Sequence, residues 1–218
     1  MTGLGLKVNE IFYSIQGEST YAGFPCVFVR LTGCNLRCSY CDTRYAYEEG
    51  QELETEEIIN QVESFQCQLV EITGGEPLLQ RETPDLVGQL FDRKYKVLME
   101  TNGSLNIDQV DKRCVRIMDV KCPSSGESHR NDLANLERLK ASDEVKFVIG
   151  GREDYEFAKQ ILWQLRSSNG SALPVHFSPV FGKQDFRKLA QWILGDHLDV
   201  KLHLQLHKII WGADAKGV

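Results

Sequence analysis

Short apolar segments that resemble buried strands alternate with amphipathic, helix-like segments along most of this 218-residue chain. Continuous apolar runs are typical of strands buried on both faces, and apolar residues at a helical period predict helices that pack on them. The predicted strands cover residues 25–31, 68–73, 96–101, 115–120, 144–149, 175–178 and 201–206. The predicted helices cover residues 55–65, 83–93, 131–141, 154–167 and 185–194, and Thr55 is the expected N-cap of the first.

This alternation predicts parallel strands joined by right-handed crossovers. We expect one α/β domain over residues 1–218, with about six parallel strands. The pattern alone fits either an open, doubly wound sheet or a partial barrel. In both architectures ligands bind at the carboxyl ends of the strands, and the most informative motifs of the chain follow predicted strands.

Charge and hydropathy exclude two classes of protein. The chain has 25 Lys and Arg against 31 Asp and Glu, a net charge of −6, which argues against nucleic-acid binding by phosphate neutralisation. No apolar run approaches the ~20 residues that span a membrane. Residues 1–10 lack a basic and then apolar signal, so we expect a cytoplasmic location.

Three of the seven cysteines, Cys34, Cys38 and Cys41, lie within eight residues of one another. An odd number of cysteines without a secretion signal argues against a disulfide framework. The surrounding residues are polar, which argues against three thiols in a core. The other four are expected to be small, buried, apolar residues: Cys26, Cys67, Cys114 and Cys122.

The three clustered cysteines predict a metal centre. A structural zinc site commonly uses two pairs of cysteines, and here the second pair is missing. A 4Fe–4S cluster is normally held by four cysteines. Three would leave one iron without a protein ligand and open to a substrate or cofactor.

Two further features indicate ligand contacts. The segment Thr73-Gly74-Gly75-Glu76-Pro77 follows a predicted strand, and its glycines permit close approach of a backbone to a ligand. Glu76 could accept hydrogen bonds from an ammonium group, although a plain turn is the alternative. Arg30 lies in an apolar strand and needs a partner, either a substrate carboxylate or an internal acidic residue.

The cysteine loop, with Tyr40 directly before its last cysteine and the glycine-rich segment one strand later, resembles the radical S-adenosylmethionine superfamily. The resemblance implies a 4Fe–4S cluster on Cys34, Cys38 and Cys41. It also implies S-adenosylmethionine on the open iron, cleaved after one-electron reduction to give a 5′-deoxyadenosyl radical. Such an enzyme needs an electron donor such as flavodoxin or ferredoxin.

Residues 10–18 (EIFYSIQGE), Arg30, the Cys-Asp-Thr at 41–43 and Gln205-x-His207-Lys208 resemble the 7-carboxy-7-deazaguanine synthase family, from Glu10 to about Trp211. This resemblance implies conversion of 6-carboxy-5,6,7,8-tetrahydropterin to 7-carboxy-7-deazaguanine in queuosine biosynthesis. Hydrogen abstraction at C6 starts the ring contraction, ammonia is released and S-adenosylmethionine is regenerated. The resemblance further implies an incomplete TIM-type barrel and a homodimer.

The same resemblance assigns site residues. It implies substrate contacts for Ile15, Gln16, Gly17, Glu18, Arg30, Thr73 and His207. It implies S-adenosylmethionine contacts for Tyr40, Cys41, Asp42, Gly75, Glu76, Asp119, Val120, Lys121 and Ser178. It makes Thr43 a ligand of Mg²⁺. In some members the chain stops soon after the His-Lys pair, whereas this chain continues to Val218.

Two other functions fit parts of the pattern. An activase that installs a glycyl radical in a partner protein shares the short chain and the three-cysteine loop. A non-catalytic zinc or iron–sulfur module needs the cysteines alone. Iron and sulfide content separates the module from the enzymes, and substrate-dependent product separates the two enzymes.

Overall fold

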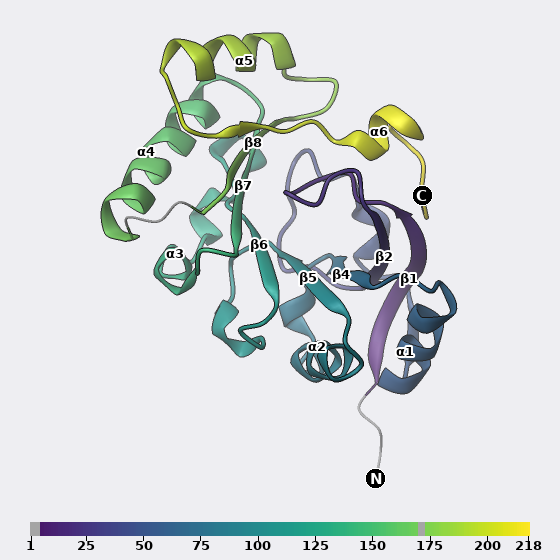
Figure 1. Cartoon of the computed structure of the whole chain (residues 1–218). Helices are drawn as coiled ribbons and strands as arrows, with labels where there is room; N and C mark the ends of the chain where they lie inside the picture. The colour runs from purple at the N-terminus through teal and green to yellow at the C-terminus, as the bar shows by residue number, and fades with distance from the viewer. Residues whose placement is uncertain (1–4, 170–172) are drawn as a thin grey trace.

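The computed structural model describes residues 5–169 and 173–218, in which nine strands form one sheet (Figure 1). The strands are β1 (Leu6–Ile15), β2 (Pro25–Leu31), β3 (Gln51–Leu53), β4 (Leu69–Gly74), β5 (Lys96–Thr101), β6 (Val115–Asp119), β7 (Glu144–Ile149), β8 (Val175–Pro179) and β9 (Lys201–Leu202). Their order across the sheet is β3-β1-β2-β4-β5-β6-β7-β8-β9. All neighbouring pairs from β2 to β9 are parallel, whereas β1 is antiparallel to both β2 and β3.

The strand order decides between the two architectures that the sequence pattern allows. From β2 to β9 the parallel strands follow chain order without a reversal. A doubly wound sheet reverses at a switch point, whereas a barrel winds in one direction. The edge strands β3 and β9 do not pair with each other in the described residues, so the barrel is incomplete. The predicted partial barrel is confirmed.

The pattern did not place β1 or β3. The sequence of β1, LKVNEIFYSI, mixes polar and apolar residues, as expected of an antiparallel strand with one partly solvated face. β3 has only three residues, of which two are exposed. Neither strand therefore has the continuous apolar run by which the parallel strands were recognised.

The described helices are α1 (Thr55–Ser64), α2 (Thr83–Asp92), α3 (Asn135–Arg138), α4 (Arg152–Asn169), α5 (Phe186–Gly195) and α6 (Leu206–Ile210). The N-cap of α1 is Glu54, not Thr55. Glu54 and Glu57 form a capping box, in which each side chain bonds the other residue's backbone nitrogen.

Two predicted elements are shorter than expected. The predicted helix at 131–141 is reduced to the four residues of α3, because Asn131 and Asn135 use their side-chain amides to bond the backbone of neighbouring loops. The predicted strand at 201–206 ends at Leu202. The chain then turns away from the sheet, and the backbone nitrogen of Leu206 donates to the Gly17 carbonyl at 3.0 Å.

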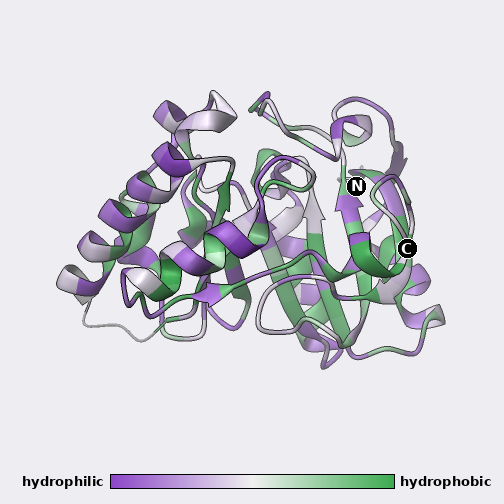
Figure 2. Cartoon of the chain, turned by 90° about the horizontal axis from the view of Figure 1, so that it is seen from above, coloured by the Kyte–Doolittle hydropathy of each residue, from purple (hydrophilic) through white to green (hydrophobic). Residues whose placement is uncertain are grey.

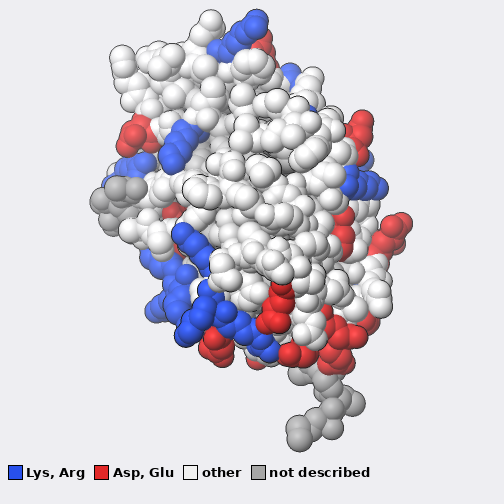
Figure 3. Space-filling model, turned by 45° about the vertical axis from the view of Figure 1, so that its right-hand side comes forward, with Lys and Arg blue, Asp and Glu red and all other residues white. Residues whose placement is uncertain are grey.

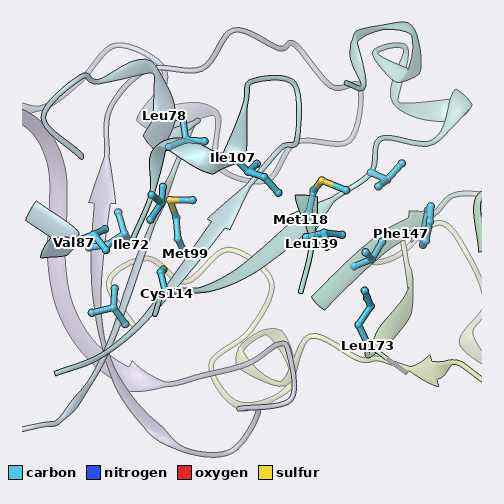
Figure 4. Packing of buried hydrophobic residues seen from close by; sticks show 14 of the residues in the cluster. Ile72, Leu78, Val87, Met99, Ile107, Cys114, Met118, Leu139, Phe147 and Leu173 are labelled. Carbon is cyan, nitrogen blue, oxygen red and sulfur yellow. The ribbon is translucent and has the colours of Figure 1, made fainter. Parts of the chain in front are cut away.

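Helices α1, α2, α4 and α5 all pack on the outer face of the sheet, where one apolar cluster contains residues from every one of them. Figure 2 shows helices with polar outer surfaces around strands that are largely apolar. Ile72, Met99 and Phe147 face this core from β4, β5 and β7 (Figure 4). The buried thiols Cys26, Cys114 and Cys122 belong to the apolar interior as predicted, and Cys67 is partly exposed.

The inner face of the sheet is different, because successive residues of a strand point to opposite faces. It carries apolar residues near the amino ends of the strands, where Leu98, Val115 and Ile117 pack with Tyr21 of the β1–β2 loop. Farther along, the inner face is charged: Glu71 lies on β4 and Lys146 on β7. The barrel interior therefore offers an apolar base beneath a charged chamber.

None of the helices in the described part of the chain is long and apolar enough to cross a membrane. The surface carries charges of both signs. Figure 3 shows Lys and Arg side chains gathered in one region of the face in view, with Asp and Glu side chains beside them. The basic side chains are thus unevenly distributed over this face.

Candidate active site

A cavity of about 610 Å³ lies at the carboxyl ends of the parallel strands and extends along the inner face of the sheet. It is lined by segments that are far apart in the sequence: the β1–β2 loop, the loops after β2, β4 and β5, and the chain from Gln205 to Val218. Sixteen predicted site residues line it: Ile15, Gln16, Gly17, Glu18, Arg30, Cys34, Cys38, Tyr40, Cys41, Asp42, Thr43, Thr73, Gly75, Asp119, Lys121 and His207.

The three clustered cysteines lie on the loop after β2, and all three are free thiols that line the cavity. The loop backbone is held by its own neighbours: the Arg37 guanidinium donates to the carbonyls of Cys34 and Leu36 at 2.7 and 2.8 Å. Gly75 brings the glycine-rich loop against it. A Cβ there would overlap the Gly33 carbonyl and lie 2.8 Å from Cβ of Cys34.

The donor set fits an iron–sulfur cluster better than a single ion. No group of three or more His, Cys, Asp or Glu side chains within residues 5–169 and 173–218 is arranged to hold one metal ion. A 4Fe–4S cluster places each thiolate on a different iron and needs them farther apart. Burial raises the pKa of Cys34 and raises that of Cys38 to about 11, so metal binding would have to displace both protons.

Arg30 has the internal acidic partner that was one of the two alternatives for its position in an apolar strand. Its Nε donates to Oε1 of Glu10 at 2.7 Å, and its guanidinium carbon lies 5.5 Å from the ring centre of Phe12 and 5.8 Å from that of Tyr45. The side chain also lines the cavity. The internal acid and the two rings hold the guanidinium in place, and its two terminal nitrogens have no hydrogen bond among the described residues.

The segment Gln16–Glu18 reaches the cavity from the amino end of the barrel. The Gln16 amide is engaged at both ends: Nε2 donates to Glu71, and Oε1 accepts from the backbone nitrogen of Glu18 at 2.9 Å. Glu18 accepts from Lys146 and from Gln205, each at 2.8 Å. Burial alone would raise the pKa of Glu18, but the charge of Lys146 and the hydrogen bonds from Lys146 and Gln205 lower it well below its usual range. Glu18 is therefore ionised.

Three charged residues that sequence reasoning missed line the same cavity: Glu71, Glu100 and Lys146. Burial, together with the charges of Glu100 and Glu18, raises the pKa of Glu71 well above its usual value. Lys146 stays protonated, because the nearby carboxylates outweigh the effect of its burial and raise its pKa. Each of these three charged residues interrupts an apolar strand. The same feature of the sequence drew attention to Arg30, and it could have identified these residues too.

Three predicted cofactor contacts do not line the cavity: Glu76, Val120 and Ser178. The expectation that the Glu76 carboxylate faces a ligand is corrected. It is fully buried and accepts from Thr101 Oγ1 at 2.9 Å and from the backbone nitrogens of Leu78 and Asn102 at 3.1 and 2.6 Å. Glu76 caps the short helix that follows, Pro77–Leu79, and fixes the glycine-rich loop from beneath.

Helix α6 lines the cavity beside the cysteine loop. Gln205 and His207 were expected at the end of a strand, but Gln205 is the N-cap of α6 and His207 lies within it. Lys208 donates to Asp42 at 2.5 Å and so ties α6 to the residue after Cys41. Thr43 Oγ1 donates to the other oxygen of Asp42 at 3.1 Å. Burial lowers the pKa of His207, so its imidazole is neutral at pH 7.

Comparison with known proteins gives one consistent result. Residues 28–119 match the model of the radical SAM superfamily. The chain is 45% identical to a 7-carboxy-7-deazaguanine synthase of Koribacter versatilis, over 98% of this chain and 100% of that protein. It is 47% identical to one of Chlorobaculum tepidum, over 98% and 97%.

Solved structures support the fold. The crystal structure of QueE from Escherichia coli aligns with a TM-score of 0.75 at 22% identity, over 92% of this chain and 94% of that one. Streptococcus suis SuiB bound to S-adenosylmethionine aligns with a TM-score of 0.56 at 13% identity, over 84% and 51%. At these identities the likeness concerns the fold alone.

Proposed function

The chain belongs to the 7-carboxy-7-deazaguanine synthase family of the radical SAM superfamily, and we propose that it converts 6-carboxy-5,6,7,8-tetrahydropterin to 7-carboxy-7-deazaguanine with release of ammonia. Relatives of this identity and coverage favour it over a glycyl-radical activase and over a non-catalytic metal module. The product belongs to 7-deazapurine and queuosine biosynthesis.

One observation carries this proposal: three free thiols and a half-free guanidinium face the same cavity from β2 and the loop that follows it. This arrangement supports a cofactor centre and an anchor for a substrate carboxylate within one chamber. Bound there, a 4Fe–4S cluster and S-adenosylmethionine supply a 5′-deoxyadenosyl radical that removes the hydrogen atom at C6 of the substrate. Residues 1–218 act as one radical SAM domain in this proposal.

The cofactor end of the chamber is formed by the cysteine loop. Cys34, Cys38 and Cys41 hold the cluster. Tyr40, Asp42, Gly75, Asp119 and Lys121 contact S-adenosylmethionine. One carboxylate oxygen of Asp119 is buried without a hydrogen-bond partner in the described residues, which leaves it able to accept from a bound ligand.

The substrate end is formed by β2, the β1–β2 loop and α6. The terminal nitrogens of Arg30 grip the substrate carboxylate, since a guanidinium matches a carboxylate with two parallel hydrogen bonds. The ionised Glu18 accepts from the amino groups of the pterin ring. Ile15, Gln16, Gly17, Thr73 and His207 complete this surface. His207 is neutral, so it can donate or accept without adding charge.

A magnesium ion belongs to the proposal, with Thr43 as its protein ligand. Thr43 Oγ1 lines the cavity and lies beside the Asp42 carboxylate. Mg²⁺ commonly takes few ligands from the protein and completes its shell with water and substrate oxygens.

The proposal includes two protein partners. The cluster needs one electron for each cleavage of S-adenosylmethionine, which a flavodoxin or a ferredoxin supplies. The chain acts as a homodimer. Size-exclusion chromatography with light scattering tests the dimer, and reduction of the cluster by each donor tests the electron source.

The test of the activity is one anaerobic incubation read by mass spectrometry. It contains the iron-reconstituted protein, a strong reductant, S-adenosylmethionine, Mg²⁺ and 6-carboxytetrahydropterin. We expect 7-carboxy-7-deazaguanine and an equal amount of ammonia. Formation of 5′-deoxyadenosine without the deazaguanine would keep the radical chemistry and contradict the substrate. Absence of both products would contradict the function.

A further inference from the structure

The loop between β1 and β2 crosses the inside of the barrel and is bonded to strands on two sides of it. Gln16 Nε2 donates to Glu71 on β4. Glu18 accepts from Lys146 on β7 at 2.8 Å. Strands β5 and β6 lie between β4 and β7 in the sheet, so the loop joins parts of the barrel that do not touch each other directly.

A third attachment lies deeper, at Thr20. The Thr20 backbone nitrogen donates to Oε2 of Glu144 at 2.9 Å, and its hydroxyl donates to Oε1 at 2.5 Å. His176 Nε2 lies 2.7 Å from Glu144 Oε2. Glu144 and His176 are each only 1% exposed, so this group is sealed from solvent. Hydrogen bonds to an ionised acceptor are stronger than neutral ones.

The Glu144 carboxylate is charged in this setting. Burial alone would raise its pKa, but the hydrogen bonds from His176 and Thr20 more than offset that effect and leave the pKa lowered. A buried carboxylate whose two oxygens both accept hydrogen bonds holds its donors firmly, because a lost bond would leave the charge unpaired.

The spacing of the attachments matches on both elements. Glu144 and Lys146 are two residues apart on β7 and therefore point to the same face of the sheet. Their partners Thr20 and Glu18 are also two residues apart. Two such contacts fix the position of the loop along the strand and its rotation. Glu18 lines the cavity and Glu144 does not, so Glu144 acts on the cavity only through the loop.

We infer that Glu144, buttressed by His176, is a positioning residue for the substrate: by anchoring Thr20, it holds Gln16–Glu18 as the floor of the substrate site. This inference rests on the proposed function, because it requires the substrate to contact that segment. Glu144 itself touches no substrate.

A substitution at the neighbouring residue Asp143 can distinguish a positioning role of Glu144 from a general effect on stability. Asp143 is also a fully buried acid, and its carboxylate binds Arg116 at 2.6 Å on the outer side of the sheet. Among the described residues, its hydrogen bonds and ion pairs join it to Arg116 and Lys140 and not to the β1–β2 loop. Asp143→Asn and Glu144→Gln therefore make the same chemical change at adjacent positions. Only Glu144→Gln replaces one of the two carboxylate oxygens that accept from Thr20 with an amide nitrogen, which cannot accept.

The experiment measures substrate kinetics and amide hydrogen exchange on cluster-loaded protein. For Glu144→Gln we expect KM for carboxytetrahydropterin to rise about tenfold, with kcat changed less than about threefold, as for the loss of one charge-assisted hydrogen bond. The exchange rates of the Gln16 and Gly23 amides, which bond Phe24 and Gln16 across the loop, should rise by a similar factor. Asp143→Asn should lower the melting temperature at least as much as Glu144→Gln does. It should change neither KM nor the exchange rates of these two amides.

Substitutions of Thr20 give a second route if Glu144→Gln fails to fold. Thr20→Val removes the hydroxyl and should raise KM, and Thr20→Ser should restore it. If the wild type forms no deazaguanine, the proposed function fails, and the exchange rates still report on the anchoring of the loop. If the wild type is active, the inference would be overturned by Glu144→Gln and Thr20→Val variants whose KM and amide exchange rates equal those of the wild type. An equal rise of KM in Asp143→Asn would also overturn it.

Discussion

Lys146 Nζ lies inside the barrel among three carboxylates: it donates to Glu18 at 2.8 Å and to Glu100, and it is 3.8 Å from Asp119. A buried lysine without such partners would lose its proton. One ammonium among three carboxylates leaves this group of four with a net negative charge, and beside it the pKa of Glu71 is raised well above its usual value. Single substitutions here should therefore change binding and pH dependence more than folding.

Arg30→Ala should weaken binding of the carboxypterin by ~2–5 kcal/mol in apparent affinity, because a charge-assisted pair with the substrate is lost. The cluster should be retained, as judged from iron content and visible absorption. Glu10→Gln is the matched control, since it removes the negative charge that pairs with Arg30 and leaves the guanidinium. Equal losses in the two variants would mean that Arg30 acts through its pair with Glu10 alone.

Glu71→Gln should make the protein relatively more stable as pH rises. The raised pKa means that folded Glu71 keeps its proton above the ordinary glutamate pKa, whereas unfolded Glu71 loses it. The wild type therefore loses stability with rising pH by up to ~1.4 kcal/mol per pH unit, and the variant does not. The charged groups that face Glu71 come from four elements: Arg30, Glu100, Lys146 and Glu18.

Unfolding midpoints of the wild type and Glu71→Gln between pH 5 and pH 8 test this expectation. Glu137→Gln, at an exposed position of α3, serves as the control and should track the wild type at every pH. A constant difference between Glu71→Gln and the wild type over this range would show that Glu71 is ionised in the folded protein.

At the scale of elements, the site depends on two segments that are not part of the parallel β/α repeat. The β1–β2 loop enters the barrel from its amino end, and α6, which follows the last strand, also lines the cavity. They meet at Gly17, whose carbonyl accepts from Leu206. Because both segments line the cavity, the contact between them helps to determine the shape of the cavity.

Gly17→Ala should displace α6 and reduce kcat/KM by about tenfold or more, since small misplacements of positioning groups have large effects on rate. The new Cβ would overlap the His207 ring and lie 2.8 Å from its backbone nitrogen. Gly88→Ala in α2 is the control. No atom lies within 4 Å of its Cβ, and alanine favours a helix by roughly 0.5–1 kcal/mol. Wild-type kinetics of Gly17→Ala would contradict a tight contact between the loop and α6.

At the scale of the whole molecule, the apolar core and the three clustered cysteines lie in different parts of the fold. The apolar core lies between the sheet and its outer helices, whereas the three cysteines lie on a loop at the carboxyl ends of the strands. In this respect the protein is unlike a small zinc domain, in which metal binding supplies the free energy of folding.

Removal of the cluster should therefore abolish cleavage of S-adenosylmethionine and leave the sheet folded. Cys38→Ala should lose iron and activity, keep its far-ultraviolet circular dichroism and melt within about 5 °C of the iron-free wild type. Cys67→Ser, at a partly exposed thiol outside the cavity, should retain iron. Global unfolding of Cys38→Ala would contradict the independence of fold and cluster.

Local patterns were sufficient for the elements and motifs that depend on near neighbours in the chain. The parallel strands were found because each is a continuous apolar run, and the cysteine loop because its three thiols lie within eight residues. Helix α3 and strand β9 were overestimated, because side-chain bonds to distant loops and the turn toward Gly17 override local preference.

The sequence by itself determined the β/α alternation, the chemistry of the cysteine loop and the family that these features indicate. Each of them depends on residues that are close together in the chain. Only the tertiary structure decided that Glu18 meets Lys146, 128 positions away, and that Thr20 meets Glu144, 124 positions away. It also turned Glu76 away from the cavity and placed α6 over it. Closing the barrel brings inward-facing residues of separate strands together, and no local pattern encodes which of them meet.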